Sequence, residues 1–125
     1  MTILGSIPVL ASKNVHNAVV FYQQAFQFVM VNQRIDSSVM PEKIRWAHLK
    51  SSHTALMLEA VDNNIQQVCC SRLYFYTDEI NSLHHYLIAK GYHPEHLYNT
   101  DYRMREFTIF DPDGHQLTIG QRLSL

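Results

Sequence analysis

Histidine and carboxylate side chains are the groups of this sequence that could bind a metal ion or move a proton. The chain carries 8 histidines, and His93-Pro94-Glu95-His96 is their densest grouping. Imidazole and carboxylate are ligands that zinc takes in proteins. No second pair matches this one, and His84 and His85, consecutive on an expected helix, point about 100° apart. Isolated surface histidines such as His16 are the favoured interpretation, and a relocated metal site is the alternative.

The elements that must position these groups fall within one globular domain, residues 1–125. Hydrophobic residues make up 46% of the chain and charged residues 17%, with a formal net charge of −1. Without a basic run, we expect neither nucleic acid nor an anionic membrane as a partner. The first 11 residues have no basic segment, and their apolar run is short, so neither a signal peptide nor a membrane span is expected.

The two cysteines, Cys69 and Cys70, are adjacent in the chain. Neighbouring residues of a strand point to opposite faces, which makes a disulfide between the two unfavourable. We predict two small buried side chains in a protein of the reducing cytoplasm.

Hydrophobic periodicity predicts one helix and four strands in the first half of the chain. Asn14 is a good N-cap, and apolar residues recur after it at steps of three and four. The helix is predicted over residues 14–26, and the strands over residues 3–11, 28–35, 44–50 and 54–61.

The second half repeats this order of elements. Asp78 is predicted to cap a helix, and Gly91 is predicted to end it in the left-handed conformation. Strands are predicted over residues 72–77, 92–98, 103–110 and 115–121.

The two halves align with each other residue by residue. A shift of 64 carries Asn14 to Asp78 and Tyr22 to Tyr86, and a shift of 61 carries the later hairpin across. Internal duplication is therefore the interpretation, giving modules at residues 1–62 and 69–122, while chance similarity of two amphipathic units is the alternative. Gln27 stands where Gly91 stands in the second half, and a left-handed residue there carries a steric cost that glycine avoids. The hairpin correspondences are Trp46 to Phe107, Leu49 to Phe110, Leu56 to Leu117 and Leu58 to Ile119.

The turn Asp111-Pro112-Asp113-Gly114-His115 lies between apolar strands, after Arg105-Glu106-Phe107 and before Leu117-Thr118-Ile119-Gly120-Gln121. With Phe21-Tyr22 in the first helix and Ile7-Pro8-Val9-Leu10 before it, this set resembles the glyoxalase/bleomycin-resistance/extradiol-dioxygenase (vicinal oxygen chelate) superfamily, and bleomycin-resistance proteins most. The resemblance implies an α+β fold of two βαβββ modules, whose curved mixed sheets enclose a cleft commonly completed in a homodimer.

The resemblance also implies four positions for metal ligands, two in each module. In the enzymes these positions hold His and Glu, on the first and last strand of each module. None of the four residues found here is an ordinary ligand of a hard metal ion. We therefore predict a metal-free protein with no cofactor; the four residues are Ile7, Met57, Ser71 and Thr118.

Strand alternation predicts which residues line the cleft. The duplicated hairpin implies pairs of Trp46 with Met57 and Leu49 with Thr54, which places Trp46, His48, Met57 and Glu59 on one face. Trp46 and Phe107 could sandwich a planar group, and Glu59 could pair with a cation on it. Packing of these residues against one another or a partner subunit is the alternative. The full predicted lining is Ile7, Val9, Trp46, His48, Met57, Glu59, Ser71, Leu73, Arg105, Phe107 and Thr118.

The predicted lining is typical of a site for an aromatic or cationic small molecule, and the resemblance to bleomycin-resistance proteins implies that the protein sequesters such a compound, for example an antibiotic, without a metal. A diverged lyase, dioxygenase or thiol transferase is the alternative, in which Ser71, His48 and Glu59 could meet. A homodimer is expected, with exchange of the first strand as one form of it. The sequence does not name the ligand.

Overall fold

The computed structural model describes residues 1–61 and 70–124. The chain divides into two compact units, Met1–Cys69 and Cys70–Leu125. The first contains β1 (Val9–Ser12), α1 (Val15–Phe26), β2 (Val29–Asp36), β3 (Lys43–Ser51) and β4 (Thr54–Ala60). The second contains β5 (Arg72–Tyr76), α2 (Ile80–Ala89), β6 (Tyr98–Asn99), β7 (Met104–Phe110) and β8 (Gln116–Arg122).

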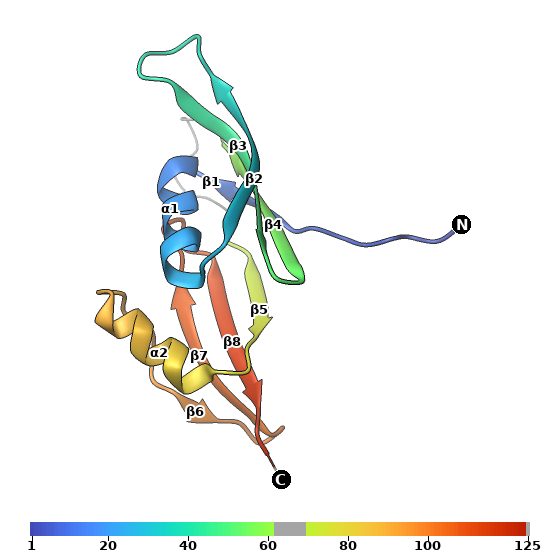
Figure 1. The fold of residues 1–125 in the computed structure, drawn as a ribbon, viewed down its shortest axis with the longest axis vertical. Coiled ribbons are helices and arrows are strands. Elements are labelled where there is room, and N and C mark those ends of the chain that lie inside the picture. The colour runs from blue at the N-terminus through green and yellow to red at the C-terminus, as the bar shows by residue number, and fades with distance from the viewer. Residues whose placement is uncertain (62–69, 125) are drawn as a thin grey trace. The chain divides into compact units, whose positions relative to one another are not determined.

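The described part of each unit is a four-stranded mixed sheet with one helix. Figure 1 shows the helix of each unit lying against its sheet. The strand orders are β1-β4-β3-β2 and β5-β8-β7-β6, so the two units share one topology. The first strand of each unit runs parallel to the last, and the remaining pairs are antiparallel. The predicted α+β class and the repeated βαβββ order are confirmed.

Helix α1 begins and ends where the sequence indicates. Asn14 is the N-cap, and its Oδ1 accepts a hydrogen bond of 3.0 Å from the backbone N–H of Asn17. The helix ends at Gln27, which is left-handed with φ 59°. Gly91 takes the same conformation after α2, with φ 92°. The predicted left-handed end at Gly91 is thus confirmed, and the first helix also ends in a left-handed residue, at Gln27.

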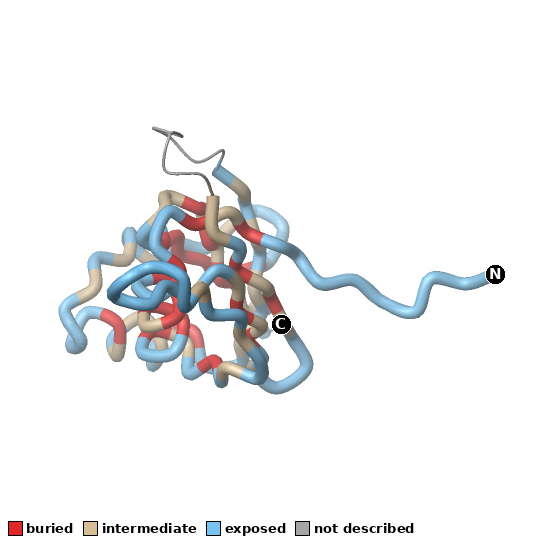
Figure 2. Tube along the Cα trace, turned by 90° about the horizontal axis from the view of Figure 1, so that it is seen from above, coloured by how far each residue is buried: buried red, intermediate tan, exposed pale blue. Residues whose placement is uncertain are grey.

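One face of each sheet packs against the helix of its unit and forms the core. In the first unit Leu10, Ala47, Leu49, Leu56 and Leu58 alternate along their strands with more exposed residues and are nearly inaccessible. This alternation is what a sheet with one covered face requires. Figure 2 shows the buried positions gathered inside the fold. We call the opposite face of each sheet the open face, because no helix among the described residues of its unit covers it.

Two predicted strands are shorter in the structure, and a proline limits each. Residues 1–8 lie outside the sheet and are exposed; Pro8 accepts a hydrogen bond from the Met57 N–H at 2.9 Å but has no N–H of its own to continue the ladder. Pro94 interrupts the predicted strand 92–98 in the same way, and only β6 forms there.

The predicted cap of the second helix is wrong by one residue. Glu79, not Asp78, is the N-cap, and its side chain makes no capping hydrogen bond. Gln121 of β8 takes this role, because its Oε1 accepts from the Ile80 N–H at 2.9 Å. A side chain distant in sequence caps α2, which a local sequence pattern does not reveal.

The predicted burial of the cysteines is wrong for Cys70, which is exposed, whereas Cys69 lies outside the described residues. Within residues 1–61 and 70–124, no helix has the length and apolar character needed to span a membrane.

Candidate functional site

The open face of the first unit carries two rows of side chains that run across all four strands. The first row is Ala11, Glu59, Trp46 and Arg34, and the second is Val9, Met57, His48 and Asn32. Neighbours in a row are paired directly across adjacent strands, where side chains on the same face come into contact. Five predicted lining residues, Val9, Trp46, His48, Met57 and Glu59, therefore share this face as expected.

The predicted pairs within this hairpin are nevertheless wrong. Trp46 pairs with Glu59 rather than Met57, and Leu49 pairs with Leu56 rather than Thr54. The cause is a tight turn in which only Ser52 and His53 separate the paired ends, with Ser52 at φ 51°. A shift by an even number of residues keeps every side chain on its face, which is why the face assignment survives.

Trp46 is half-buried, with a cation already against its ring. The Arg34 Cζ lies 5.4 Å from the ring centroid, and the His48 ring lies 6.3 Å away at 48°. A guanidinium at this distance is attracted by the negative face of the indole. The first row thus places a cation-binding aromatic ring between a carboxylate and a guanidinium.

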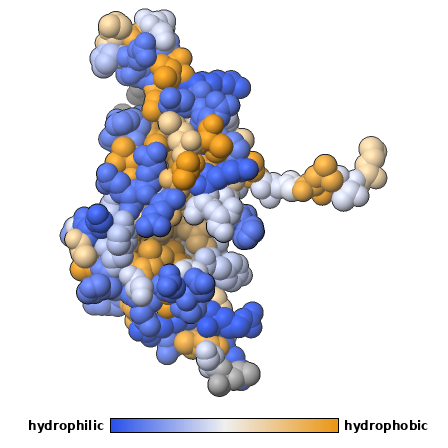
Figure 3. All heavy atoms as spheres, viewed as in Figure 1, coloured by the Kyte–Doolittle hydropathy of each residue, from blue (hydrophilic) through white to orange (hydrophobic). Residues whose placement is uncertain are grey.

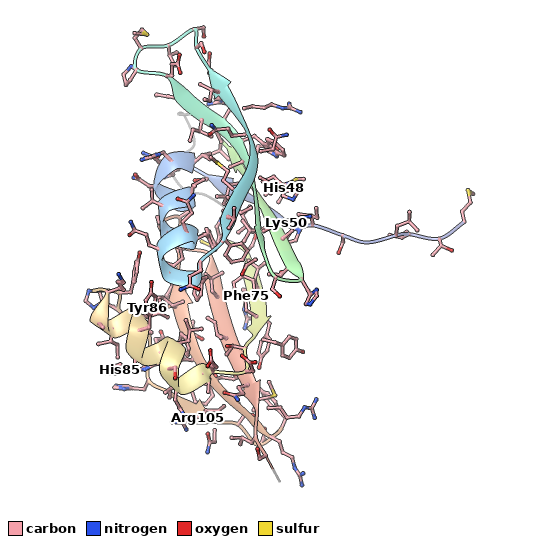
Figure 4. All side chains as sticks on the ribbon, viewed as in Figure 1. His48, Lys50, Phe75, His85, Tyr86 and Arg105 are labelled. Carbon is pink, nitrogen blue, oxygen red and sulfur yellow. The ribbon has the colours of Figure 1, made fainter. Side chains whose placement is uncertain are left out.

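His48 adds an unused hydrogen-bonding atom to this face. Figure 4 shows His48 and Lys50 on the side of β3 away from α1. The Nε2 atom of His48 is buried and has no hydrogen-bond partner within residues 1–61 and 70–124. Buried polar atoms are nearly always paired, so this unpaired nitrogen beside Trp46 is an exception within the described residues. Ile7 precedes β1 and lies outside both rows.

The open face of the second unit carries a different set of residues from the predicted one. Its rows are Tyr74, Thr118 and Thr108, and next to it Tyr76, Gly120, Glu106 and Tyr98. Thr118 lies on this face as predicted, and its Oγ1 is 3.1 Å from that of Thr108. Ser71 precedes β5, where its backbone N–H donates to the Nδ1 of the buried His115.

Phe107, Arg105 and Leu73 lie on the covered face, so their predicted place in the lining is wrong. The Phe107 ring is fully buried, 5.0 Å from the ring of His84 in α2. The Arg105 Nε donates to Asn81 Oδ1 of the same helix at 2.9 Å (Figure 4). Leu73 pairs with Leu117, which is completely buried.

The physical reason is a difference of one residue between the two modules. Ala47 pairs with Leu58 and Phe107 with Ile119, so Phe107 corresponds to Ala47 and not to Trp46. A slip of one residue exchanges the two faces of a strand. Phe110, matched to the buried Leu49 in the sequence, is likewise exposed.

His84 is also placed differently from the expected solvated helix residue. Its ring contacts Phe107, and its Nε2 lies 2.9 Å from the carbonyl oxygen of Glu95. His85, which is exposed on the same helix, is the histidine that faces solvent.

Glu106 is the functional candidate that sequence reasoning missed. Its side chain is 1% exposed and accepts three hydrogen bonds from tyrosine hydroxyls: from Tyr74 at 2.6 Å, from Tyr102 at 2.8 Å and from Tyr98 at 2.9 Å. We call Glu106 with Tyr74, Tyr98 and Tyr102 the tyrosine–carboxylate cluster. The available signal was the density of tyrosines around the Arg-Glu-Phe run, but their convergence depends on pairings across β5, β6, β7 and β8.

Burial alone would raise the pKa of Glu106, but the three hydroxyl hydrogen bonds outweigh it and hold that pKa below its usual range. The pKa values of Tyr98 and Tyr102 are raised, mainly because each hydroxyl donates to the Glu106 carboxylate. Burial, followed by the same kind of hydrogen bond, raises the pKa of Tyr74. The cluster therefore holds one negative charge at neutral pH, on the carboxylate.

Gly120 makes the cluster possible because it has no side chain. A Cβ built on Gly120 would overlap the hydroxyl end of Tyr74, and the methyl carbon of Met104 would be 3.1 Å from it. The Tyr74 side chain crosses β8 at this point to reach Glu106 on β7. Here glycine serves close approach rather than an unusual backbone conformation.

The four family positions for metal ligands do not fit a metal ion. Ile7, Met57 and Thr118 offer no imidazole, carboxylate or thiolate. Counted from the observed N-cap Glu79, the remaining position falls on Arg72 rather than Ser71, and a guanidinium is no better a ligand. Among the residues described, no three or more His, Cys, Asp or Glu form a group that could hold a metal ion.

Solved structures show what this architecture resembles. A glyoxalase-related enzyme from Clostridium phytofermentans is 15% identical with a TM-score of 0.81, over 98% of each chain. The bleomycin resistance determinant encoded on transposon Tn5 is 16% identical with a TM-score of 0.75, over 96% of this chain and 98% of its own. Lactoylglutathione lyase from Agrobacterium tumefaciens is 19% identical with a TM-score of 0.72, over 96% of this chain and 95% of its own.

No model of a known protein family and no curated protein matches the sequence. The chain has the glyoxalase/bleomycin-resistance fold, and the resemblance inferred from the sequence is confirmed at the level of the fold. Enzymes and a resistance determinant share this fold, so the function must be argued from the site.

Proposed function

We propose that the protein binds a small aromatic cation on the open face of the first unit and sequesters it without a metal ion. The observation that carries this proposal is the row of Arg34, Trp46 and Glu59. Within it, a guanidinium already lies against the indole, and a carboxylate is paired across from the same residue. A planar ligand cation would take the position of Arg34 on the ring and bring its charge toward Glu59.

His48 supports the same assignment from the neighbouring row. Its unpartnered Nε2 offers a ligand one hydrogen bond next to the indole. A few convergent polar atoms among aromatic and apolar side chains are typical of small-molecule sites. The bleomycin resistance determinant with this fold makes an antibiotic one candidate for the ligand.

A matched pair of ligands tests the proposal. N-methylquinolinium and quinoline share a ring system, and only the first carries a permanent charge. We expect N-methylquinolinium to change Trp46 emission in a saturable way, because Trp46 is the only tryptophan. Trp46→Ala should weaken its binding by about 1–3 kcal/mol, through loss of stacking and buried area.

Glu59→Gln separates charge recognition from shape. The substitution should weaken the binding of N-methylquinolinium and leave the binding of quinoline nearly unchanged, because only the charge of the side chain is removed. His85→Ala, on an exposed position of α2, is the control and should change neither. Equal weakening of both ligands by Glu59→Gln would point to a structural role and count against the assignment.

Chelation tests the metal-free part of the proposal. The four ligand positions carry no suitable donor, so dialysis against EDTA should leave the titration unchanged. Loss of binding in EDTA, restored by one equivalent of a divalent metal, would overturn this part and favour a diverged enzyme.

A further inference from the structure

The tyrosine–carboxylate cluster on the open face of the second unit is a site of its own. It lies wholly within that unit, on β5, β6 and β7 and in the loop before β7. None of its four residues belongs to the Trp46 site or to the family positions for metal ligands. The buried negative charge of Glu106 therefore plays no part in the proposed binding at Trp46.

The hydrogen bonds of Glu106 restrict what can pair with it. A carboxylate has about four lone-pair positions, and three tyrosine hydroxyls fill three of them. A primary ammonium or a guanidinium would have to displace a tyrosine to use its N–H donors. A cation without N–H groups needs no such displacement, because it is attracted by charge alone.

The tyrosine rings provide the surface for such a cation. The exposed fractions are 39% for Tyr74, 48% for Tyr98 and 61% for Tyr102, so the rings are accessible while the carboxylate is not. Tyr76, 81% exposed, extends this aromatic surface, with its ring 5.2 Å from that of Tyr74. A hydroxyl that donates to a carboxylate shifts electron density into its ring, which strengthens attraction of a cation to the ring face.

We propose that this cluster binds an organic cation of the quaternary ammonium class over its tyrosine rings, with the charge of Glu106 beneath them. This inference rests on the proposed function only in taking the ligand to be cationic; the residues and the preferred charged group differ. Gly120 supports it, because the glycine lets Tyr74 cross β8 and complete the ring of donors.

Choline and its neutral isostere 3,3-dimethyl-1-butanol test the inference on the full-length protein. The two differ in charge but hardly in shape, and ethanolamine replaces the quaternary group with a primary ammonium. Calorimetric or NMR titration should give a Kd for choline roughly three- to tenfold lower than for either of the others, the range of one to two cation–π contacts. Equal affinities for choline and the neutral alcohol would overturn the inference.

Variants locate the binding. Tyr102→Leu, which removes an exposed ring of the cluster, is expected to raise the Kd for choline by roughly threefold or more. Glu106→Gln should raise it further and remove the preference over the alcohol, because the amide keeps the shape without the charge. Glu42→Gln, which removes an exposed carboxylate in the first unit, is the matched control and should have no effect.

The outcomes separate this inference from the function proposed for Trp46. Binding of N-methylquinolinium that Trp46→Ala weakens, together with no charge-dependent choline binding, would overturn the cluster alone. Charge-dependent choline binding that Glu106→Gln weakens, with no response of Trp46 to N-methylquinolinium, would sustain the cluster and overturn the Trp46 site. Unchanged choline affinity in both Tyr102→Leu and Glu106→Gln would show that the cluster serves only to hold the sheet together.

Discussion

At the scale of single residues, Glu106 and Gly120 depend on each other. Gly120→Ala would place a methyl group against the Tyr74 phenol, which must then leave Glu106. We expect the substitution to lower the free energy of unfolding by about 1–3 kcal/mol, the cost of overpacking. Urea denaturation measures this change. Gly5→Ala is the control, because a Cβ at Gly5 meets no atom within 4 Å; equal effects at both positions would contradict this account of Gly120.

The lowered pKa of Glu106 predicts how stability depends on pH. In the unfolded chain a glutamate has a pKa of about 4.3, and the folded-state value lies below that. The ionised carboxylate therefore stabilises the fold fully above this pH, and the contribution disappears as the pH falls through the folded-state value. Urea unfolding between pH 3 and pH 7 measures this. The free energy of unfolding should fall less on acidification for Glu106→Gln than for the wild type. An equal fall in the free energy of unfolding for the two proteins would contradict this prediction.

The tyrosines of the cluster act in the opposite direction. Their pKa values are raised, so their contribution is fully present below about pH 10 and is lost as the pH rises through the folded-state values. The cluster is therefore most stable between these two limits.

At the scale of elements, the end of α1 offers a test of backbone strain. Gln27 is left-handed at φ 59°, where glycine would carry no penalty from a Cβ. Gln27→Gly removes the steric penalty of the Cβ in the folded state but gives the unfolded chain more conformational freedom. The net effect should be a rise in the free energy of unfolding of roughly 0.5–1 kcal/mol. Gln23→Gly, in the same helix, should lower it by about 1 kcal/mol. A loss of stability in Gln27→Gly would show that no strain is stored there.

Elements with strong periodicity were predictable from the sequence. The α1 helix with its Asn14 cap and the five longer strands follow from local patterns within a residue or two; these strands are β2, β3, β4, β7 and β8. The N-cap of α2 was not predictable, since Gln121 reaches it from another element. Prolines at positions 8 and 94 ended strands that apolar composition alone suggested were longer.

The residues of the candidate site were predictable only where an error in the strand pairing still assigned each side chain to the correct face of the sheet. In the first unit an even shift kept Trp46, His48 and Glu59 on the open face. In the second unit the modules differ by one residue, so Phe107 was assigned to the face that Glu106 occupies. The length of a turn is set by long-range pairing, and a one-residue difference is invisible in an alignment of two short amphipathic strands.

At the scale of the whole molecule, we propose a homodimer. Residues 1–8 lie outside the sheet with Ile3 and Leu4 almost fully exposed, as Figure 3 shows for the apolar residues of this segment. Next to them, β1 is an edge strand of its sheet. Exposed apolar residues beside an edge strand favour pairing with a second copy.

Sedimentation velocity at micromolar concentration tests the dimer. We expect a particle of twice the 14.6 kDa chain mass, and partial dissociation when Leu4→Asp places a charge in the exposed apolar segment. A particle of 14.6 kDa for the wild type would contradict the proposal.

The measurement that tests the central claim most directly is an NMR titration of the full-length protein with N-methylquinolinium in the presence of EDTA. We expect saturable shifts of the Trp46 indole N–H and of the backbone amides of Arg34 and Glu59, which share one row across β2, β3 and β4. Shifts confined to α1 and α2, or none up to millimolar ligand, would contradict it.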